Sequence, residues 1–253
     1  MSHVLVSKSD GILRLQMNRP EKKNALTLAM YETLVAGLAD ADQDPDVRVV
    51  LISGLPGLFT SGNDLKDFMN PSDLSAVVRF LNAIINAEKP IVAAVSGTAI
   101  GIGTTMLLHC DLVYAAEDAA LKMPFVDLGL VPEAASSVLL PAMFGHQRAS
   151  ALLLLGETLS GSEAHRYGLV NKVFPDFDTL EAGALERVRH LATRAPASVR
   201  ATKKLLKRAQ KSAVDEAMAA ELQVFGERLM SPEAVEAFTA FMQRRPADFS
   251  KFH

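Results

Sequence analysis

Apolar and polar residues alternate near the amino terminus, where Leu13, Leu15 and Met17 fall on one face of residues 11–18. Alternation with a period of two is typical of a half-buried strand. A Ser9-Asp10-Gly11 turn comes directly before it. We therefore expect this strand to be the second of a hairpin.

Longer apolar runs and helical spacing alternate along the next part of the chain. Residues 47–53, 90–95 and 111–115 have the length of buried strands. Apolar stripes predict one helix from an N-cap at Thr27 to about Asp42 and another over about 73–87. Strands that alternate with helices predict βαβ units and a largely parallel α/β sheet that is covered on both faces.

The strand pattern almost disappears from about residue 146 onward, and only residues 169–174 retain it. One helix is expected to end near Arg194, and three more are predicted at about 197–211, 215–230 and 232–244. We therefore expect an α/β core in residues 1–194 and a helical region in residues 195–253. A helical region of this size beside an α/β core is either a lid or an oligomerisation element.

The composition is that of an ordinary soluble globular protein, with 49% hydrophobic and 22% charged residues among 253. The net charge of −3 gives no reason to expect nucleic acid or an anionic membrane as a partner. No window reaches the ~18 uninterrupted apolar residues of a membrane span. The start of the chain has no signal-peptide pattern, and the single cysteine, Cys110, excludes an internal disulfide framework.

Several cofactor and nucleophile motifs are absent. Gly101-Ile102-Gly103 lacks the third glycine of a dinucleotide fingerprint, and the chain has neither a P-loop nor a Gly-x-Ser-x-Gly elbow. The histidines are scattered and none belongs to a His-Glu-x-x-His motif, so no metal site is predicted. We interpret His109, beside an apolar helix, as structural and Cys110 as a small core residue.

One carboxylate has an unusual setting, because Glu133 is the only charged residue between Leu128 and Phe144. Removal of a carboxylate from water raises its pKa toward neutral pH, which suits a general acid or base. The spacing also fits a second interpretation, in which Glu133 occupies the water-exposed first turn of a helix.

Two glycine-rich turns are the second candidate feature. Residues 60–65 come after the strand at 47–53, and residues 97–103 come after the strand at 90–95. Turns at the carboxyl ends of neighbouring parallel strands meet where α/β folds bind ligands. Two backbone N–H groups directed into that space make an oxyanion hole. The alternative is a pair of ordinary strand-to-helix turns.

Six segments of the chain resemble, in order, the crotonase or enoyl-CoA hydratase/isomerase superfamily: NRPEKKNAL (18–26), FTSGNDLKDF (59–68), AVSGTAIGIG (94–103), CDLVYAA (110–116), PFVDLGLVPEAASS (124–137) and LSGSEAHRYGLVNKVF (159–174). The resemblance implies a spiral of ββα units with a C-terminal helical region that builds homotrimers, often paired into hexamers. It also implies an acyl-CoA thioester as substrate, with no separate cofactor, metal, nucleic acid or membrane partner.

The resemblance assigns roles to individual residues. It implies that the backbone N–H groups of Asn63 and Ile102 form the oxyanion hole and that Glu133 is catalytic. The expected CoA-binding residues are Lys22, Ala25, Ser61, Gly62, Asn63, Asp64 and Leu65. Three further residues are candidates either for contacts with CoA phosphates or for a solvated surface: Lys66, Phe249 and Lys251.

The carboxylates distinguish between the reactions of the family. Enoyl-CoA hydratases use two glutamates, whereas this sequence has Thr105 and Phe125 at the corresponding positions. Glu133 matches instead the single glutamate of Δ3,Δ2-enoyl-CoA isomerases, which move the double bond of a 3-enoyl-CoA to the 2-position. The alternatives are hydration or another acyl-CoA reaction, with Asp64 and Asp127 as spare acids, and a non-catalytic acyl-CoA-binding subunit.

The last three residues, Lys251-Phe252-His253, are not the usual Ser-Lys-Leu peroxisomal address. We therefore expect the cytoplasm of a bacterium as the location, with a peroxisome or a mitochondrion as the alternatives.

Overall fold

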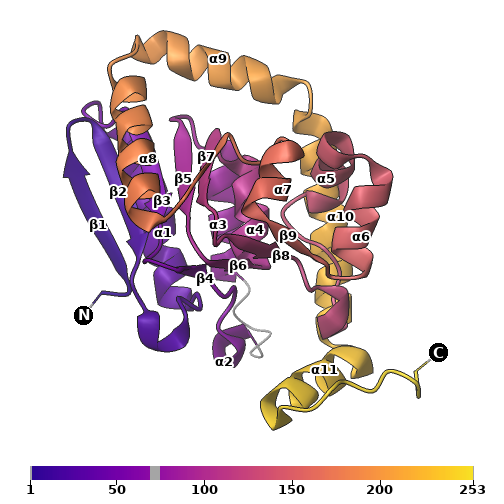
Figure 1. Cartoon of the computed structure of the whole chain (residues 1–253). Coiled ribbons are helices and arrows are strands. Elements are labelled where there is room, and N and C mark those ends of the chain that lie inside the picture. Colours follow the sequence, from indigo (N-terminus) through magenta and orange to yellow (C-terminus); the bar gives the residue numbers. More distant parts are fainter. Residues whose placement is uncertain (1, 69–74, 253) are drawn as a thin grey trace.

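The main sheet has six strands in the order β1-β2-β3-β5-β7-β10 (Figure 1). The structure is a computed structural model that describes residues 2–68 and 75–252. Only β1 and β2 pair in antiparallel fashion, with Ser9 opposite Ile12 as the predicted hairpin requires, and the other neighbours are parallel. The strands are β1 (Val4–Ser9), β2 (Ile12–Met17), β3 (Val49–Ser53), β5 (Ile91–Val95), β7 (Leu112–Ala116) and β10 (Lys172–Phe174).

A second sheet was not expected from the sequence. Its short strands lie in the order β4-β6-β8-β9: β4 (Leu58–Thr60), β6 (Thr98–Ile100), β8 (Ala120–Lys122) and β9 (Thr158–Ser160). The chain passes three times from a long strand of the main sheet to a short strand of the second sheet and then into helix. This repeat is the ββα unit, and each short strand has only three residues, too few to show a period of two.

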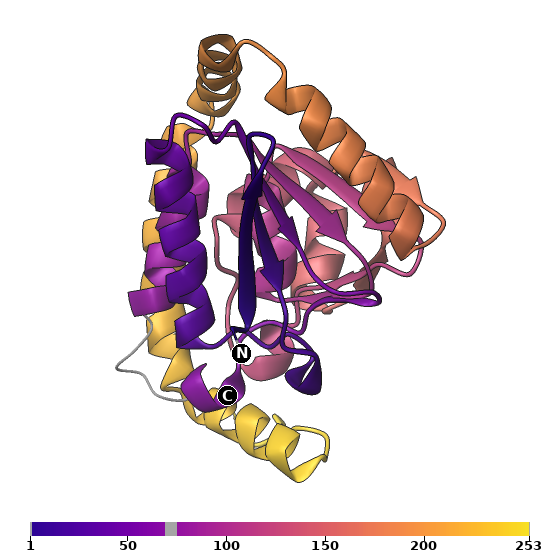
Figure 2. The same cartoon turned by 90° about the vertical axis from the view of Figure 1, so that its left-hand side faces the viewer.

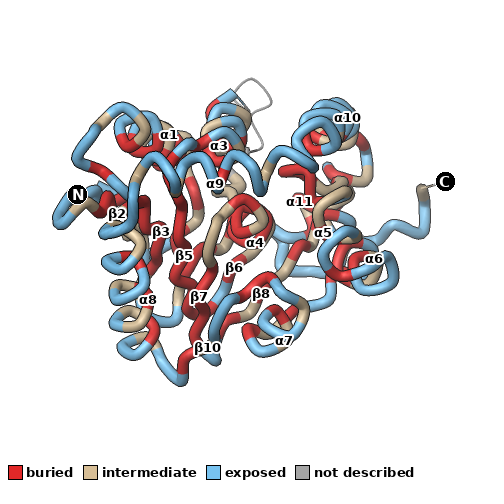
Figure 3. The backbone as a smooth tube through the Cα atoms, turned by 90° about the horizontal axis from the view of Figure 1, so that it is seen from above, coloured by how far each residue is buried: buried red, intermediate tan, exposed pale blue. Residues whose placement is uncertain are grey.

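Helices cover both faces of the main sheet, as predicted (Figure 3). Helix α8 (Phe177–Ala192) packs on one face, where Leu180 and Val188 meet Leu51 and Val92. Helices α1 (Leu28–Gln43) and α3 (Ser75–Asn86) lie over the other face. Because both faces are covered, every residue of β3 is buried, which explains the continuous apolar run there.

The predicted caps and boundaries hold closely for these helices. The hydroxyl of Thr27 accepts the N–H of Met30 and begins α1, as expected. The start of the helix predicted over 73–87 lies outside the described residues. The remaining elements of the core are η1 (Pro20–Lys22), α2 (Leu65–Phe68), α4 (Ile102–Thr105), η3 (Met106–His109), η4 (Val126–Leu128), α5 (Ser136–Phe144), α6 (His146–Leu154) and α7 (Gly161–Arg166).

Three long helices complete the chain, close to the predicted ranges: α9 (Pro196–Arg208), α10 (Lys211–Leu229) and α11 (Pro232–Gln243). Helix α9 crosses one end of the core and α10 runs beside α5 (Figures 1 and 2). The ammonium group of Lys203 on α9 is buried and lies 2.8 Å from both the Asp111 carboxylate and the Lys89 carbonyl oxygen. The division of the chain into a core and a helical region between residues 194 and 195 stays a prediction. In the described residues no helix is long and apolar enough to cross a membrane.

The turn after β5 approaches another backbone so closely that only glycine fits. Gly97 has a φ of +67°, and a Cβ atom added to it would lie 1.8 Å from the carbonyl oxygen of Gly57. The N–H of Gly97 donates to the Asp118 carboxylate at 3.0 Å, which holds the turn in place. This contact fixes the start of β6 against the segment that leads into β4.

Replacement of Gly97 by alanine is expected to lower the free energy of unfolding by about 2–4 kcal/mol, because strained backbone and a backbone clash add together. The control is Gly145→Ala, where φ is +81° but no atom lies within 4 Å of the added Cβ. That change is expected to cost only about 1 kcal/mol. Urea denaturation of both variants measures the difference, and equal losses would contradict the importance of the contact.

Candidate active site

Glu133 lies in a loop just before α5 and is only 7% exposed. The hydroxyl of Thr105 donates to its Oε1 atom, while its Oε2 atom has no hydrogen-bond partner among the described residues. Burial raises the pKa of Glu133 to about 8, although the Thr105 hydrogen bond acts in the opposite direction. The interpretation of Glu133 as a water-exposed residue in a first helical turn is therefore wrong.

The backbone after Glu133 is strained. In what we name the Glu133 turn (residues 133–137), Ala134 and Ala135 have φ values of +61° and +54°, which cost roughly 1–2 kcal/mol per residue for an L-amino acid. The Nε2 atom of His109 lies 2.8 Å from the Ala134 carbonyl oxygen, and Glu221 accepts the N–H of Ala135 at 2.6 Å. These partners stabilise a conformation that alanine rarely adopts.

His109 and Cys110 are both in environments that do not favour a catalytic role. Burial lowers the pKa of His109 to about 4, so its ring is neutral at neutral pH and Nε2 donates to Ala134. Burial raises the pKa of the Cys110 thiol to about 12, which keeps it protonated and unreactive. Both residues are structural, in agreement with the sequence analysis.

The two glycine-rich turns lie side by side, and short strands that we had not expected form part of them. Residues 60–65 begin at the last residue of β4, and residues 97–103 contain β6, the parallel neighbour of β4 in the second sheet. Gly62, with a φ of +87°, approaches β6 so closely that an added Cβ would be 2.9 Å from the Ile100 carbonyl oxygen. Neighbouring carboxyl ends therefore bring the two turns together, as the argument from parallel strands requires.

Each turn contains a backbone N–H group with no acceptor among the described residues. A parallel bridge pairs Leu26 with Asn63, in which Leu26 bonds to Gly62 and Asp64, so the N–H of Asn63 points to the other side. Ile102 is the first residue of α4, and the N–H of a first helical residue has no partner within the helix. Such a pair suits an oxyanion.

Side chains connect these turns to Glu133. Thr105, which bonds to Glu133, belongs to the same short helix as Ile102. Tyr31 of α1 donates to the Oδ1 atom of Asn63 at 2.5 Å; burial and, secondarily, the charge of Glu133 raise the pKa of Tyr31 well above its ordinary value. The sequence analysis identified Glu133, Asn63 and Ile102 but missed the contacts made by Thr105 and Tyr31.

The residues predicted to bind CoA also lie together. Ser61 donates its N–H to the Lys23 carbonyl oxygen, and Leu26 donates to Gly62, so residues 22–26 run beside residues 61–65. Asn24, which is fully buried, fastens this arrangement: its side chain bonds to the backbone of Arg19 at 2.6 Å and of Phe59 at 3.0 Å. Lys22 is exposed, Ala25 and Leu65 are partly buried, and the side chain of Lys66 lies outside the described part.

The spare carboxylates are engaged elsewhere. Asp64 forms an ion pair with Arg19 at 2.6 Å, and Asp127, half-exposed, lies 3.3 Å from the Lys122 ammonium group. In the C-terminal tail, Lys251 lies 3.7 Å from Glu236. These contacts show where the three side chains lie, and their roles in the site stay predictions.

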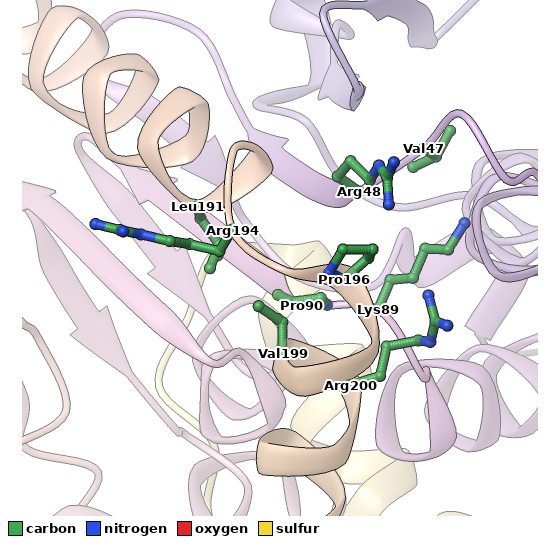
Figure 4. A pocket seen from close by; sticks show the side chains of 9 residues that line it. All are labelled: Val47, Arg48, Lys89, Pro90, Leu191, Arg194, Pro196, Val199 and Arg200. Atoms are coloured by element: carbon green, nitrogen blue, oxygen red, sulfur yellow. The ribbon is translucent and has the colours of Figure 1, made fainter.

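A hollow elsewhere on the molecule has a different chemistry (Figure 4). It lies at the amino ends of β3 and β5, beside the start of α9, and none of the candidate site residues lines it. Its charged lining residues are all cationic: Arg48, Lys89, Arg194 and Arg200. None of its lining residues is a carboxylate, and the buried carboxylate of Glu133 makes the Glu133 site the better candidate for proton transfer.

The family described as enoyl-CoA hydratase/isomerase matches residues 7–251. With this match and the geometry above, the chain belongs to the enoyl-CoA hydratase/isomerase family, the crotonase superfamily that its motifs resemble. The family takes its name from enzymes that hydrate or isomerise enoyl-CoA.

The names of the relatives differ in the activity that they give. The chain is 36% identical to enoyl-CoA delta isomerase 2 of Rattus norvegicus over 96% of its own length, but spans only 64% of that protein. It is 35% identical to 2,3-dehydroadipyl-CoA hydratase of Escherichia coli strain K12, covering 98% of this chain and 99% of that one. The solved structure of Pseudomonas aeruginosa OdaA, 45% identical, superimposes with a TM-score of 0.94 over 96% of this chain and 100% of that one. The fold is therefore the crotonase fold.

Replacement of Thr105 by valine is expected to raise the pKa of Glu133 above its value of about 8, because it removes a hydrogen bond to the charged form worth about 1.5–3 kcal/mol. Carbon-13 NMR of the labelled glutamate carboxyl groups measures this pKa, with Glu133→Gln identifying the signal. Thr104→Val is the matched control, since Thr104 is equally buried but bonds to the Ala99 carbonyl oxygen. If the pKa of Glu133 were unchanged in Thr105→Val, the hydrogen bond from Thr105 would not control it.

Proposed function

We propose that this enzyme is an enoyl-CoA isomerase that converts 3-enoyl-CoA to 2-enoyl-CoA, with Glu133 as the proton carrier. The observation that carries the proposal is the buried carboxylate of Glu133, whose Oε1 atom accepts a hydrogen bond from Thr105 while its Oε2 atom has no hydrogen-bond partner among the described residues. Its pKa of about 8 lets it both take and return a proton near neutral pH. In the proposed reaction an acyl-CoA is the substrate and no separate cofactor takes part.

In this mechanism the thioester oxygen of the substrate binds to the N–H groups of Asn63 and Ile102. The Oε2 atom of Glu133 removes a proton from C2, which gives a dienolate whose negative charge lies on the thioester oxygen. The protonated carboxyl group then returns a proton to C4, and the double bond moves into conjugation with the carbonyl. The two N–H groups are most useful when the oxygen becomes negative, and loss of one such donor costs roughly 3–4 kcal/mol in other enzymes.

Neither of the two glutamates of a hydratase has a counterpart at the corresponding positions of this sequence. Thr105 occupies one of the two corresponding positions and uses its hydroxyl to hold Glu133. Phe125 occupies the other and is buried. A proton shift within the substrate requires one carboxyl group and no water, so these residues favour isomerisation. Hydration is the second candidate, because a relative over nearly the whole chain is named as a hydratase.

Glu133→Gln is expected to lower the rate of isomerisation by about 10²- to 10⁴-fold, because it removes the acid–base group. The assay follows the conjugated thioester chromophore after addition of a 3-enoyl-CoA, where the wild type gives a rise. Asp127→Asn, which changes an exposed spare acid, serves as the control. Full turnover by Glu133→Gln would refute the base assignment, and loss of the chromophore from a 2-enoyl-CoA would indicate hydration.

For the assembly, we propose a homotrimer or a hexamer made of two trimers. The support is a group of exposed large apolar side chains on α9, directly after α10 and on α11, with exposed fractions of 59–76%: Leu205, Leu206, Met230, Val235, Phe241 and Met242. Exposed apolar side chains in such numbers mark surfaces that bury themselves against a partner, and most homo-oligomers close by symmetry.

Leu206→Glu, at a residue 76% exposed, is expected to dissociate the assembly toward the monomer, since it places a charge in the proposed interface. Light scattering coupled to gel filtration measures the mass. Val6→Glu on β1, at a residue 51% exposed, provides a control that should retain the wild-type mass. A monomeric wild type, or no change in Leu206→Glu, would contradict this interface.

A further inference from the structure

A residue far along the chain holds the Glu133 turn. Glu221 lies on α10 and is only 7% exposed. Its Oε2 atom accepts the N–H of Ala135 at 2.6 Å and its Oε1 atom accepts the N–H of Ser137 at 2.9 Å. Both oxygens of this carboxylate therefore accept backbone N–H groups at the start of α5.

Helix α5 needs this help because it has no cap of its own. Its N-cap residue is Ala135, which has no side-chain oxygen and adopts a left-handed conformation. The first N–H groups of a helix have no acceptors within the helix, and a local serine, threonine or aspartate normally supplies one. Here the acceptor comes from another helix, 86 residues later in the chain.

We propose that Glu221 is a positioning residue for Glu133: by holding the N–H groups of Ala135 and Ser137, it fixes the left-handed turn and thereby the direction of the catalytic carboxyl group. The proposal rests on the proposed function of Glu133 as the base. It gives α10, in the helical region, a part in the reaction besides any part in assembly.

The position of Glu221 within α10 supports this role over a role in packing alone. The buried face of the helix consists of Val214, Met218, Glu221, Phe225 and Leu229, so Glu221 occupies a place where an apolar side chain would pack. A buried carboxylate is costly unless hydrogen bonds satisfy it. Burial accordingly raises the pKa of Glu221, while its bonds to Ser137 and Ala135 act in the opposite direction.

Charge supplies a second link between the two glutamates. The titratable groups that act on or lie against the Glu133 turn are Tyr31 from α1, His109 from η3 and Glu221 from α10. His109 is neutral at neutral pH, for the reason given above, with the cationic Lys203 and Lys207 of α9 adding to the effect of its burial. The negative charge of Glu221 raises the pKa of Glu133, so its removal should lower that pKa, the opposite of the effect of Thr105→Val.

Two variants separate geometry from charge. Glu221→Gln keeps the length of the side chain but loses its charge and one acceptor oxygen, whereas Glu221→Asp keeps the charge but is too short to reach both N–H groups. In the first we expect kcat for a 3-enoyl-CoA to fall about 10- to 100-fold, KM to stay within about two-fold, and the pKa of Glu133 to fall. In Glu221→Asp we expect a similar loss of kcat, whereas the pKa of Glu133 should lie closer to its wild-type value than in Glu221→Gln.

The control is Glu163→Gln. Glu163 also accepts a helix-capping N–H, that of Ser160 at 3.0 Å, but it belongs to α7 and does not touch the Glu133 turn. It should leave kcat and the pKa of Glu133 unchanged. Thermal unfolding confirms that each protein is folded before its kinetics are compared.

The proposal is overturned if folded Glu221→Gln keeps kcat within about two-fold and leaves the Glu133 titration unchanged, or if both Glu221 variants fail to fold, since Glu221 would then maintain the fold and not the base. Glu133→Gln is measured in parallel. If that variant keeps full turnover, the proposed function fails, and the carboxyl titration by NMR still decides whether Glu221 controls Glu133.

Discussion

Glu133 keeps a carboxyl group almost out of contact with water, and the surrounding structure offsets the free energy that this costs. Its folded-state pKa of about 8 exceeds the ordinary value of 4.5, so between these values the native protein holds a proton that the unfolded chain has lost. This contribution to stability therefore decreases as pH rises from about 4.5 to 8, by a total on the order of 3–5 kcal/mol. The burial that raises the pKa of Glu133 thus lowers the stability of the fold at neutral and higher pH.

The fold supports this arrangement by bringing short segments together. Each ββα unit sends a three-residue strand into the second sheet, and because β4 and β6 are parallel neighbours, the turn that contains Asn63 lies beside the segment that leads into Ile102. Thr105 ties the carboxyl group to the helix that begins at Ile102. The strained turn after Glu133 is held by His109 and Glu221, so different parts of the chain position Glu133 and the two backbone N–H groups.

The sequence predicted the long elements well because burial on two faces gives β3 and β5 continuous apolar runs, and because Thr27 and Pro232 mark helix starts. It did not predict the second sheet, whose three-residue strands are too short for a pattern. Thr105 was noticed only as the absence of a glutamate, and Tyr31 only as part of an apolar stripe, since a tertiary contact leaves no local signal. Glu221 did leave one: a carboxylate on the stripe of Val214, Met218, Phe225 and Leu229.

The separation of Ala135 and Glu221 by 86 residues has a consequence for biosynthesis. Synthesis proceeds from the amino terminus, and long-range contacts form only after their later partner is available. The β-strands of both sheets precede α9, so a nascent chain can assemble the core while α10 is still missing. Glu133 would then sit on a turn without its last support, and this arrangement would be complete only when α10 leaves the ribosome and docks.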